Sequence, residues 1–334
     1  MAPSPRPESP RRSIAITVII ACLAAAGGLA AWLTVRSDDS PDFCRELAQN
    51  GRIQDALSDS GGAETDCAAL GRSIKKATTG ATPQKHSIEQ AWAMKRSLLA
   101  IAETMDSTGA KSFDASLSAP LTSALADYSE DIFGVLNLSD GYGRGMGPSD
   151  PPWEDNGGIH VAVPQKNIMR VLRGVSSSPA QYSELRLSVT RQAARYLATT
   201  PDTKEHNIIA AGPKVIGAVL GGFDAVADDA IGGFDENDST RWQEKALKGL
   251  TEGAPRTAPS YKKDPEGNIV TTWQLHLAAT KPSGVIPAIR NQAPDMTKGW
   301  GSGAHLGKRT IDSLSIDARE SAMNSRNLRA KDLG

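Results

Sequence analysis

The chain has 334 residues, of which 37 are Lys or Arg and 38 are Asp or Glu, so its formal net charge is −1. This balance excludes the strongly basic footprint of a nucleic-acid-binding protein, and 39% hydrophobic residues exclude a wholly disordered chain. Three cysteines are too few for a disulfide scaffold or a four-thiolate zinc site. The length predicts about two folded domains with tails.

Residues 13–35 contain no charged side chain. Their 23 positions would give a helix of about 34 Å, enough to cross a hydrocarbon core of about 30 Å. Arginines precede this segment and aspartates follow it closely, at positions 6, 11 and 12 and at positions 38, 39 and 42. The positive-inside rule therefore predicts a cytoplasmic tail (1–12), a transmembrane helix (13–35) and a single-pass cell-membrane protein whose C-terminal bulk is extracytoplasmic.

Two alternatives to this anchor stay open. The run Ala24-Ala25-Ala26 fits the cleavage site of a secretory signal peptide, and Cys22 after Ile19-Ile20-Ala21 resembles a lipobox. The first would yield a secreted protein and the second a lipoprotein. An uncleaved anchor is favoured because the apolar stretch continues for nine residues beyond Ala26. Small residues four apart, Ala24 and Gly28, also permit a homo-oligomer through close helix packing.

Residues 36–138 are predicted to form a helical N-terminal ectodomain unit. Cys44 and Cys67 are the only cysteines beyond the apolar segment, so we predict a disulfide between them in an oxidising exterior. Ser87 and Gln90 have capping-box spacing, and the apolar stripe from Ala91 to Met105 follows them with helical periodicity. A second helix is predicted from Ala119 to Leu138.

The segment 139–158 holds six glycines and three prolines, so it is predicted to be a linker between two units. The C-terminal unit, 159–334, is expected to be mainly helical with at most short strands. Ile269–Leu277 is rich in β-branched residues and predicts a strand. Lys281–Gly303 has no regular pattern, and 306–333 is predicted to be a helical but weakly apolar, weakly ordered tail. The fold class is therefore mainly α, with a two-part ectodomain.

Ile208–Phe223 is apolar apart from Lys214, and Gly217 and Gly221 form a G-x-x-x-G pattern in it. Such glycines can form a helix-pairing or a membrane-inserting face. A buried core helix is favoured because sixteen residues with a central lysine are short for a membrane span.

No catalytic motif is found, and we predict no catalytic, cofactor-binding or metal-binding residue. The five histidines lack the spacing of a zinc protease. The acidic run Asp235–Asp238 begins like a calcium loop, but Thr240 and Ala246 stand where Gly and Glu are required. Helix capping by Asp238 or Ser239 is the favoured interpretation. The adjacent carboxylates Asp228 and Asp229 diverge on a helix and do not predict an acid–base pair.

Residues 171–231 resemble a helical segment of large actinobacterial proteins of the polymorphic-toxin or specialised-secretion type. The matching positions are Val171-Leu172-Arg173-Gly174, Ser178-Pro179-Ala180, Tyr182, Leu185, Tyr196-Leu197, Gly212, Val219-Leu220 and Asp224. The resemblance implies an interaction or structural module without a catalytic site, and it carries over no functional residue.

The sequence thus predicts a bacterial cell-surface protein held in the lipid bilayer by residues 13–35. Its expected role is non-catalytic: binding an unidentified protein partner, around secretion or toxin systems. Two alternatives are a cell-envelope hydrolase whose site is assembled from distant residues, and a membrane-inserting helical protein.

Overall fold

The computed structural model describes residues 40–58, 61–139, 141–201, 205–281 and 284–334. These residues are mainly helical, with fourteen α-helices and two short strands, which confirms the mainly α class. The predicted cytoplasmic tail and the predicted transmembrane helix at 13–35, with the alternative lipobox at Cys22, lie outside the described residues.

Six helices precede the only described strands. Their bounds are α2 (Ser40–Gln49), α3 (Gly51–Leu57), α4 (Cys67–Thr78), α5 (Ile88–Thr108), α6 (Ala115–Asp127) and α7 (Ser129–Asn137). A 3-10 turn, η2 (Tyr142–Arg144), then leads to an antiparallel hairpin of β1 (Trp153–Asp155) and β2 (Gly158–His160), in which Trp153 is opposite His160.

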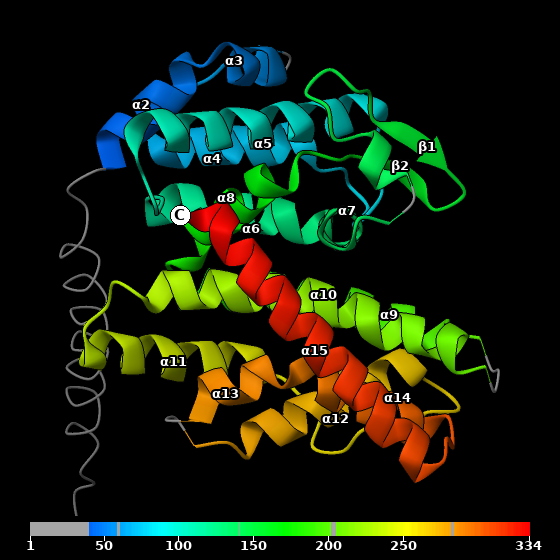
Figure 1. The fold of residues 1–334 in the computed structure, drawn as a ribbon. Coiled ribbons are helices and arrows are strands. Elements are labelled where there is room, and N and C mark those ends of the chain that lie inside the picture. The colour runs from blue at the N-terminus through cyan, green and yellow to red at the C-terminus, as the bar shows by residue number, and fades with distance from the viewer. Residues whose placement is uncertain (1–39, 59–60, 140, 202–204, 282–283) are drawn as a thin grey trace, which may run out of the picture. The chain divides into compact units, whose positions relative to one another are not determined.

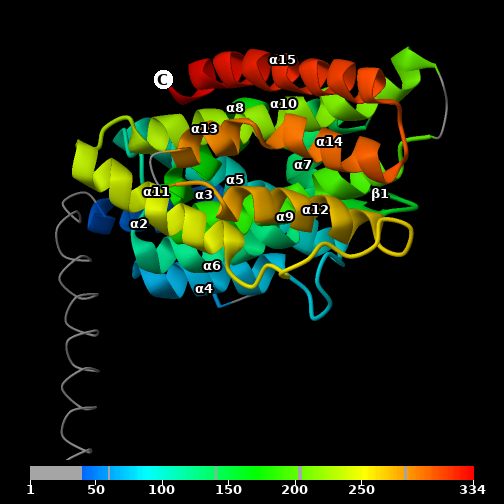
Figure 2. The same cartoon turned by 90° about the horizontal axis from the view of Figure 1, so that it is seen from below.

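Eight helices follow the hairpin. Their bounds are α8 (Gln165–Ser176), α9 (Pro179–Ala198), α10 (His206–Ile231), α11 (Glu236–Thr251), α12 (Pro265–Ala278), α13 (Val285–Arg290), α14 (Gln292–Gly303) and α15 (Lys308–Leu333). Figure 1 shows α15 crossing the front of the other helices, and Figure 2 shows it lying along one face of the molecule.

Local capping chemistry explains where several helices begin. The Ser87 hydroxyl accepts from the Gln90 amide (3.3 Å) and the Gln90 side chain accepts from the Ser87 amide (2.8 Å), so the predicted capping box starts α5. Ser178 and Gln181 also have capping-box spacing, but the Ser178 side chain makes no such bond, and Pro179 occupies the first turn of α9. Asp235, one turn before the predicted Asp238 or Ser239, caps α11.

Two predictions for the C-terminal part were wrong. Ile269–Leu277 lies in helix α12, because Asp264 caps that helix, Pro265 opens it, and Ile269 and Trp273 reach the core. The tail is helical as predicted, in α15, and it is ordered by packing against α10 and α14. The segment 281–303 likewise contains α13 and α14.

One hydrophobic core spans the residues before and after the predicted linker. Residues 41–334 form one compact unit, in which α6 and α7 pack on α9 and α5 packs on α8. The predicted division into units at 36–138 and 159–334 is therefore corrected. The segment between them does not separate two domains, because Tyr142 and Trp153 contact each other edge to face, with ring centroids 5.0 Å apart, and pack against the shared core.

Candidate functional site

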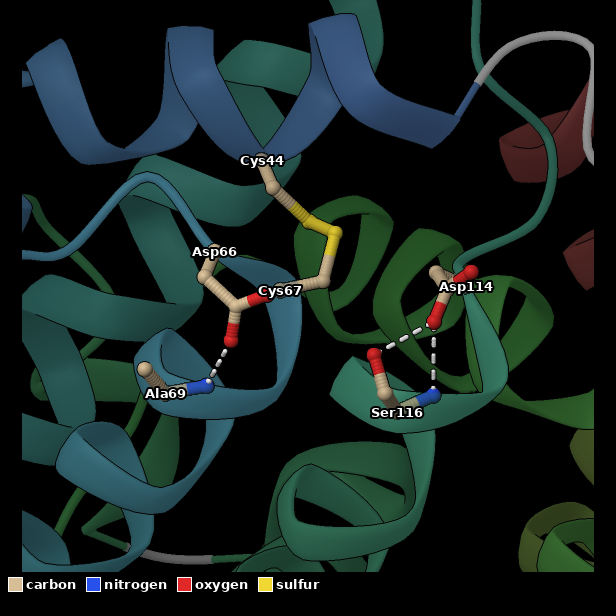
Figure 3. The surroundings of a disulfide bond; sticks show 6 residues. All are labelled: Cys44, Asp66, Cys67, Ala69, Asp114 and Ser116. Atoms are coloured by element: carbon tan, nitrogen blue, oxygen red, sulfur yellow. Dashed lines mark hydrogen bonds between the residues drawn. A yellow bond between two sulfur atoms is a disulfide. The ribbon is translucent and has the colours of Figure 1, made fainter.

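The two predicted cysteines are joined. Cys44 of α2 and Cys67 at the start of α4 form a disulfide with a Cα–Cα distance of 5.4 Å (Figure 3). Asp66 fixes the start of α4, because its Oδ1 accepts a hydrogen bond from the Ala69 amide at 2.8 Å. The bond ties the first described helix to the helical core, and Cys44 is buried within it.

The predicted glycines Gly217 and Gly221 pair two helices inside the protein. A Cβ at either position would lie less than 3.0 Å from the backbone carbonyl of Ala318 or Ala322 in α15. Ser321 and Ser325 add hydrogen bonds to the carbonyls of Lys214 and Ala218, each at 2.6 Å. The small residues therefore allow the backbones of α10 and α15 to approach closely.

The alternative use of the same face is membrane insertion. Asn207–Ile231 in α10 is long and apolar enough to cross a membrane, and 72% of its apolar window is buried inside the protein. In the structure, the glycine face is occupied by α15. A core helix of a folded domain accounts for both observations.

A cluster of polar side chains fastens the hairpin to α7. The Asp131 Oδ1 accepts from the Tyr142 hydroxyl (3.0 Å) and from the Val161 amide (3.1 Å), and lies 3.2 Å from His160 Nδ1. His160 Nε2 is 3.0 Å from Asp155 Oδ1. His160 is thus held between two carboxylates and is only 6% exposed.

These contacts determine the charge of His160. The hydrogen bond to Asp131, together with both carboxylate charges, raises its pKa to about 9, against the opposing effect of burial. Burial and the Asp131 charge raise the pKa of Tyr142 well above its usual range. At neutral pH the cluster therefore holds an imidazolium with both nitrogens occupied, which suits structural locking better than proton abstraction.

A second polar network lies in the core between α9, α10 and α14. Arg186 is fully buried, and its guanidinium donates to Gln292 Oε1 (2.7 Å), Tyr182 Oη (2.6 Å) and the Ile289 carbonyl (3.0 Å). Its Nη1 is 2.8 Å from Asp224 Oδ1. Burial raises the pKa of Asp224, and the neighbouring Arg186 charge opposes that rise.

An open cleft lies at the C-terminal ends of α8, α10 and α15. Its volume is about 600 Å³, within the range of ligand sites. Its charged lining comes from one loop and three helices that are far apart in the sequence: Lys111, Arg173, Asp228, Asp229 and Arg326. The cleft is open to solvent and includes the backbone of Gly232 and Gly233.

Ion pairs fix the walls of this cleft. Asp228 pairs through one oxygen with Arg290 and through the other with Arg326. Arg173 pairs with Asp229 and also donates to the Lys111 carbonyl (2.9 Å) and to Ser177 Oγ (2.8 Å). One carboxylate thus holds arginines from α13 and α15 side by side, and Arg173 positions the loop that carries Lys111.

Sequence reasoning had discounted the two aspartates of this cleft as an acid–base pair, and the structure gives each of them an arginine partner. A usable signal was the i, i+4 spacing of Asp224 and Asp228 in the mainly apolar second half of α10, which places both carboxylates along one side of the helix. The arginine partners of Asp228 lie 62 and 98 positions away in the sequence, and no local pattern predicts them.

Among the described residues, no three His, Cys, Asp or Glu side chains gather in a group that could hold a metal ion. Comparison with protein-family models, curated proteins and solved structures gives no match for this chain.

Proposed function

We propose that this chain is a single-pass membrane protein whose extracytoplasmic helical domain binds a partner protein without catalysis, in the setting of secretion or toxin systems. Residues 13–35 hold it in the bilayer, with residues 1–12 in the cytoplasm. Packing of that segment against a second copy would allow a homo-oligomer. The resemblance of residues 171–231 to a secretion-associated helical segment supports this setting.

The Cys44–Cys67 disulfide supports the extracytoplasmic placement. Structural disulfides persist in oxidising compartments and are rare in the cytosol. This one lies directly after the uncharged segment, so the domain it closes follows the predicted membrane helix without an intervening domain.

The observation that carries the binding role is the charged cleft between α8, α10 and α15. It is preformed, open and lined by side chains whose positions are set by ion pairs. Fixed groups lose little conformational freedom when a ligand binds, so such a lining favours recognition. The histidine best placed for proton transfer, His160, is occupied on both nitrogens by carboxylates.

Topology and partner binding are tested together in living cells. We expect protease added to wall-stripped cells to digest the domain, while a tag fused before residue 1 stays protected. Chemical cross-linking of the full-length, affinity-tagged chain should then retain one protein reproducibly. A domain that protease reaches only in lysates contradicts the placement, and the absence of any cross-linked protein under all growth conditions contradicts the binding role.

A further inference from the structure

The charge of the cleft differs in sign from that of the domain around it. Residues 37–334 carry 33 basic and 37 acidic side chains, whereas the cleft is lined by three cations and two carboxylates. Arg290, paired to Asp228 at its edge, adds a further cation. A local positive cleft on an acidic domain concentrates anionic groups at that point.

Part of this positive charge is available to a ligand. The Lys111 ammonium makes no hydrogen bond or ion pair within the part of the chain that the structure describes, and the residue is exposed. Arg326 uses its Nε for Asp228, and its side chain is 32% exposed. Guanidinium N–H groups bind carboxylates through paired hydrogen bonds.

The same cleft also offers acceptors. Asp228 and Asp229 are 22% and 31% exposed, and Gly232 and Gly233 present backbone at the end of α10. The last carbonyl groups of a helix have no donors within the helix. A ligand that brings N–H donors together with carboxylates would satisfy both kinds of group.

We propose that this cleft takes an acidic polypeptide segment of the partner, with Lys111 and Arg326 binding its carboxylates. The inference rests on the proposed function and names the chemistry of its partner. A volume of about 600 Å³ lies within the range of clefts that hold ligands, so the cleft has room for a short peptide segment. Its two carboxylates disfavour a densely charged phosphate surface, whereas peptide amides can donate to them.

The test measures the fluorescence anisotropy of a labelled hexa-aspartate peptide with the full-length chain in detergent-free nanodiscs of neutral lipid. We expect saturable binding that weakens steeply from 50 to 300 mM salt, since surface charges are screened over about 10 Å at 0.1 M. Hexa-asparagine should not bind. Inorganic phosphate and phosphatidylglycerol vesicles serve as the competing anions, and neither should displace the peptide.

Three single substitutions localise the site. Lys111→Gln and Arg326→Gln should each raise the dissociation constant about tenfold, the loss expected for one charge-assisted hydrogen bond. Arg309→Gln is the matched control, because it removes one exposed charge from the opposite end of α15 and should leave binding unchanged. Lys111→Gln breaks no ion pair among the described residues, so its effect does not depend on altered folding.

The proposal is overturned if the peptide does not bind, if Arg309→Gln weakens binding as much as Arg326→Gln, or if vesicles bind in a cleft-dependent way and displace the peptide. None of these outcomes contradicts the proposed partner-binding role, which is tested separately. A partner cross-linked in cells to the Arg326→Gln protein as efficiently as to wild type would preserve the binding role and reject the cleft.

Discussion

Two carboxylates one turn apart on α10 have opposite surroundings. Asp224 is 3% exposed and faces Arg186, which is fully buried. Asp228 is 22% exposed and faces Arg290 and Arg326, which are 39% and 32% exposed. The inner pair is enclosed by the core, so it can only hold α9 and α10 together. The outer pairs reach solvent, so they can also meet a ligand.

The difference follows from the cost of removing charge from water. A buried ion that loses its partner has no solvent to replace it, whereas an exposed ion is rehydrated at once. An ion pair therefore stabilises the fold at Asp224, whereas at Asp228 its charged groups remain accessible to a ligand. Substitutions that remove one charge at a time measure how much more the inner pair contributes to the free energy of unfolding than the outer pairs do.

The largest effect is expected at the inner pair. Arg186→Met leaves Asp224 buried without its cation and should lower the free energy of unfolding by about 3–5 kcal/mol. Urea denaturation followed by circular dichroism measures the loss. Adding Asp224→Leu should restore much of the stability, because no uncompensated charge remains. A loss below about 1 kcal/mol in the single variant would place this pair with the outer ones.

The disulfide provides a covalent standard against which the inner pair can be ranked. Cys44 and Cys67 are separated by 23 positions, and opening a loop of that size should cost about 3 kcal/mol through chain entropy. Dithiothreitol should therefore lower the melting temperature of the wild-type chain. The Cys44→Ser, Cys67→Ser double variant should already melt at the lower temperature and should not respond to the reductant. Equal sensitivity of both proteins would show that the bond contributes nothing.

His160 lies between the two extremes, because it joins the buried Asp131 to Asp155, which is 56% exposed. Its folded pKa of about 9 lies above the unfolded value of 6.5, so its stabilisation is complete below pH 6.5 and is lost as pH rises towards 9. The loss is at most about 3 kcal/mol, from 1.36 kcal/mol per pKa unit.

Urea midpoints at pH 6.5 and pH 9.5 measure this loss, and His160→Gln should abolish the difference between them. His86 does not interfere, because burial lowers its pKa and places its titration on the acid side of this window. A wild-type protein whose midpoint is the same at both pH values would contradict the locked imidazolium.

The smallest effect on stability is expected at the outer pair. Arg326→Gln should change the free energy of unfolding by less than about 1 kcal/mol, because Asp228 keeps Arg290 and both are hydrated. The same urea titration measures it beside Arg186→Met. A cost comparable to that of Arg186→Met would mean that the cleft is part of the structural network, and its anion-binding role would lose its physical basis.

Much of the fold could be predicted from local patterns. The stripe Ala91, Met94, Leu98, Ile101 and Met105 is buried throughout. The stripe from Leu121 to Val135 is also buried, although the structure divides the helix predicted over 119–138 at Tyr128 into α6 and α7. Such periodicity reports which face of a helix meets a core. It does not show whether two helices share one core or belong to separate domains. The single core across 139–158 was missed for this reason, since glycine content describes local flexibility and says nothing about packing at a distance.

Tertiary context decided the other cases. The β-branched run Ile269-Val270-Thr271-Thr272 favours a strand locally, yet capping by Asp264 and burial of Trp273 make it helical. The weakly apolar tail, predicted to be helical but weakly ordered, is ordered because Ala318 and Ala322 fit against the glycines of α10. The cleft was beyond sequence reasoning, because its charges meet only after α8, α10 and α15 have packed.

The close fit of α15 against α10 has a consequence for biogenesis. Ala318 and Ala322 reach Gly217 and Gly221 across about a hundred residues of intervening chain, so the helix that covers apolar α10 is synthesised well after α10 itself. Until then the apolar face of α10 around its two glycines is exposed, and contacts of such long sequence separation form slowly. A nascent chain that emerges N-terminus first would therefore depend on holdase chaperones until α15 has been released, and a chain truncated before α15 would be a target for proteolysis.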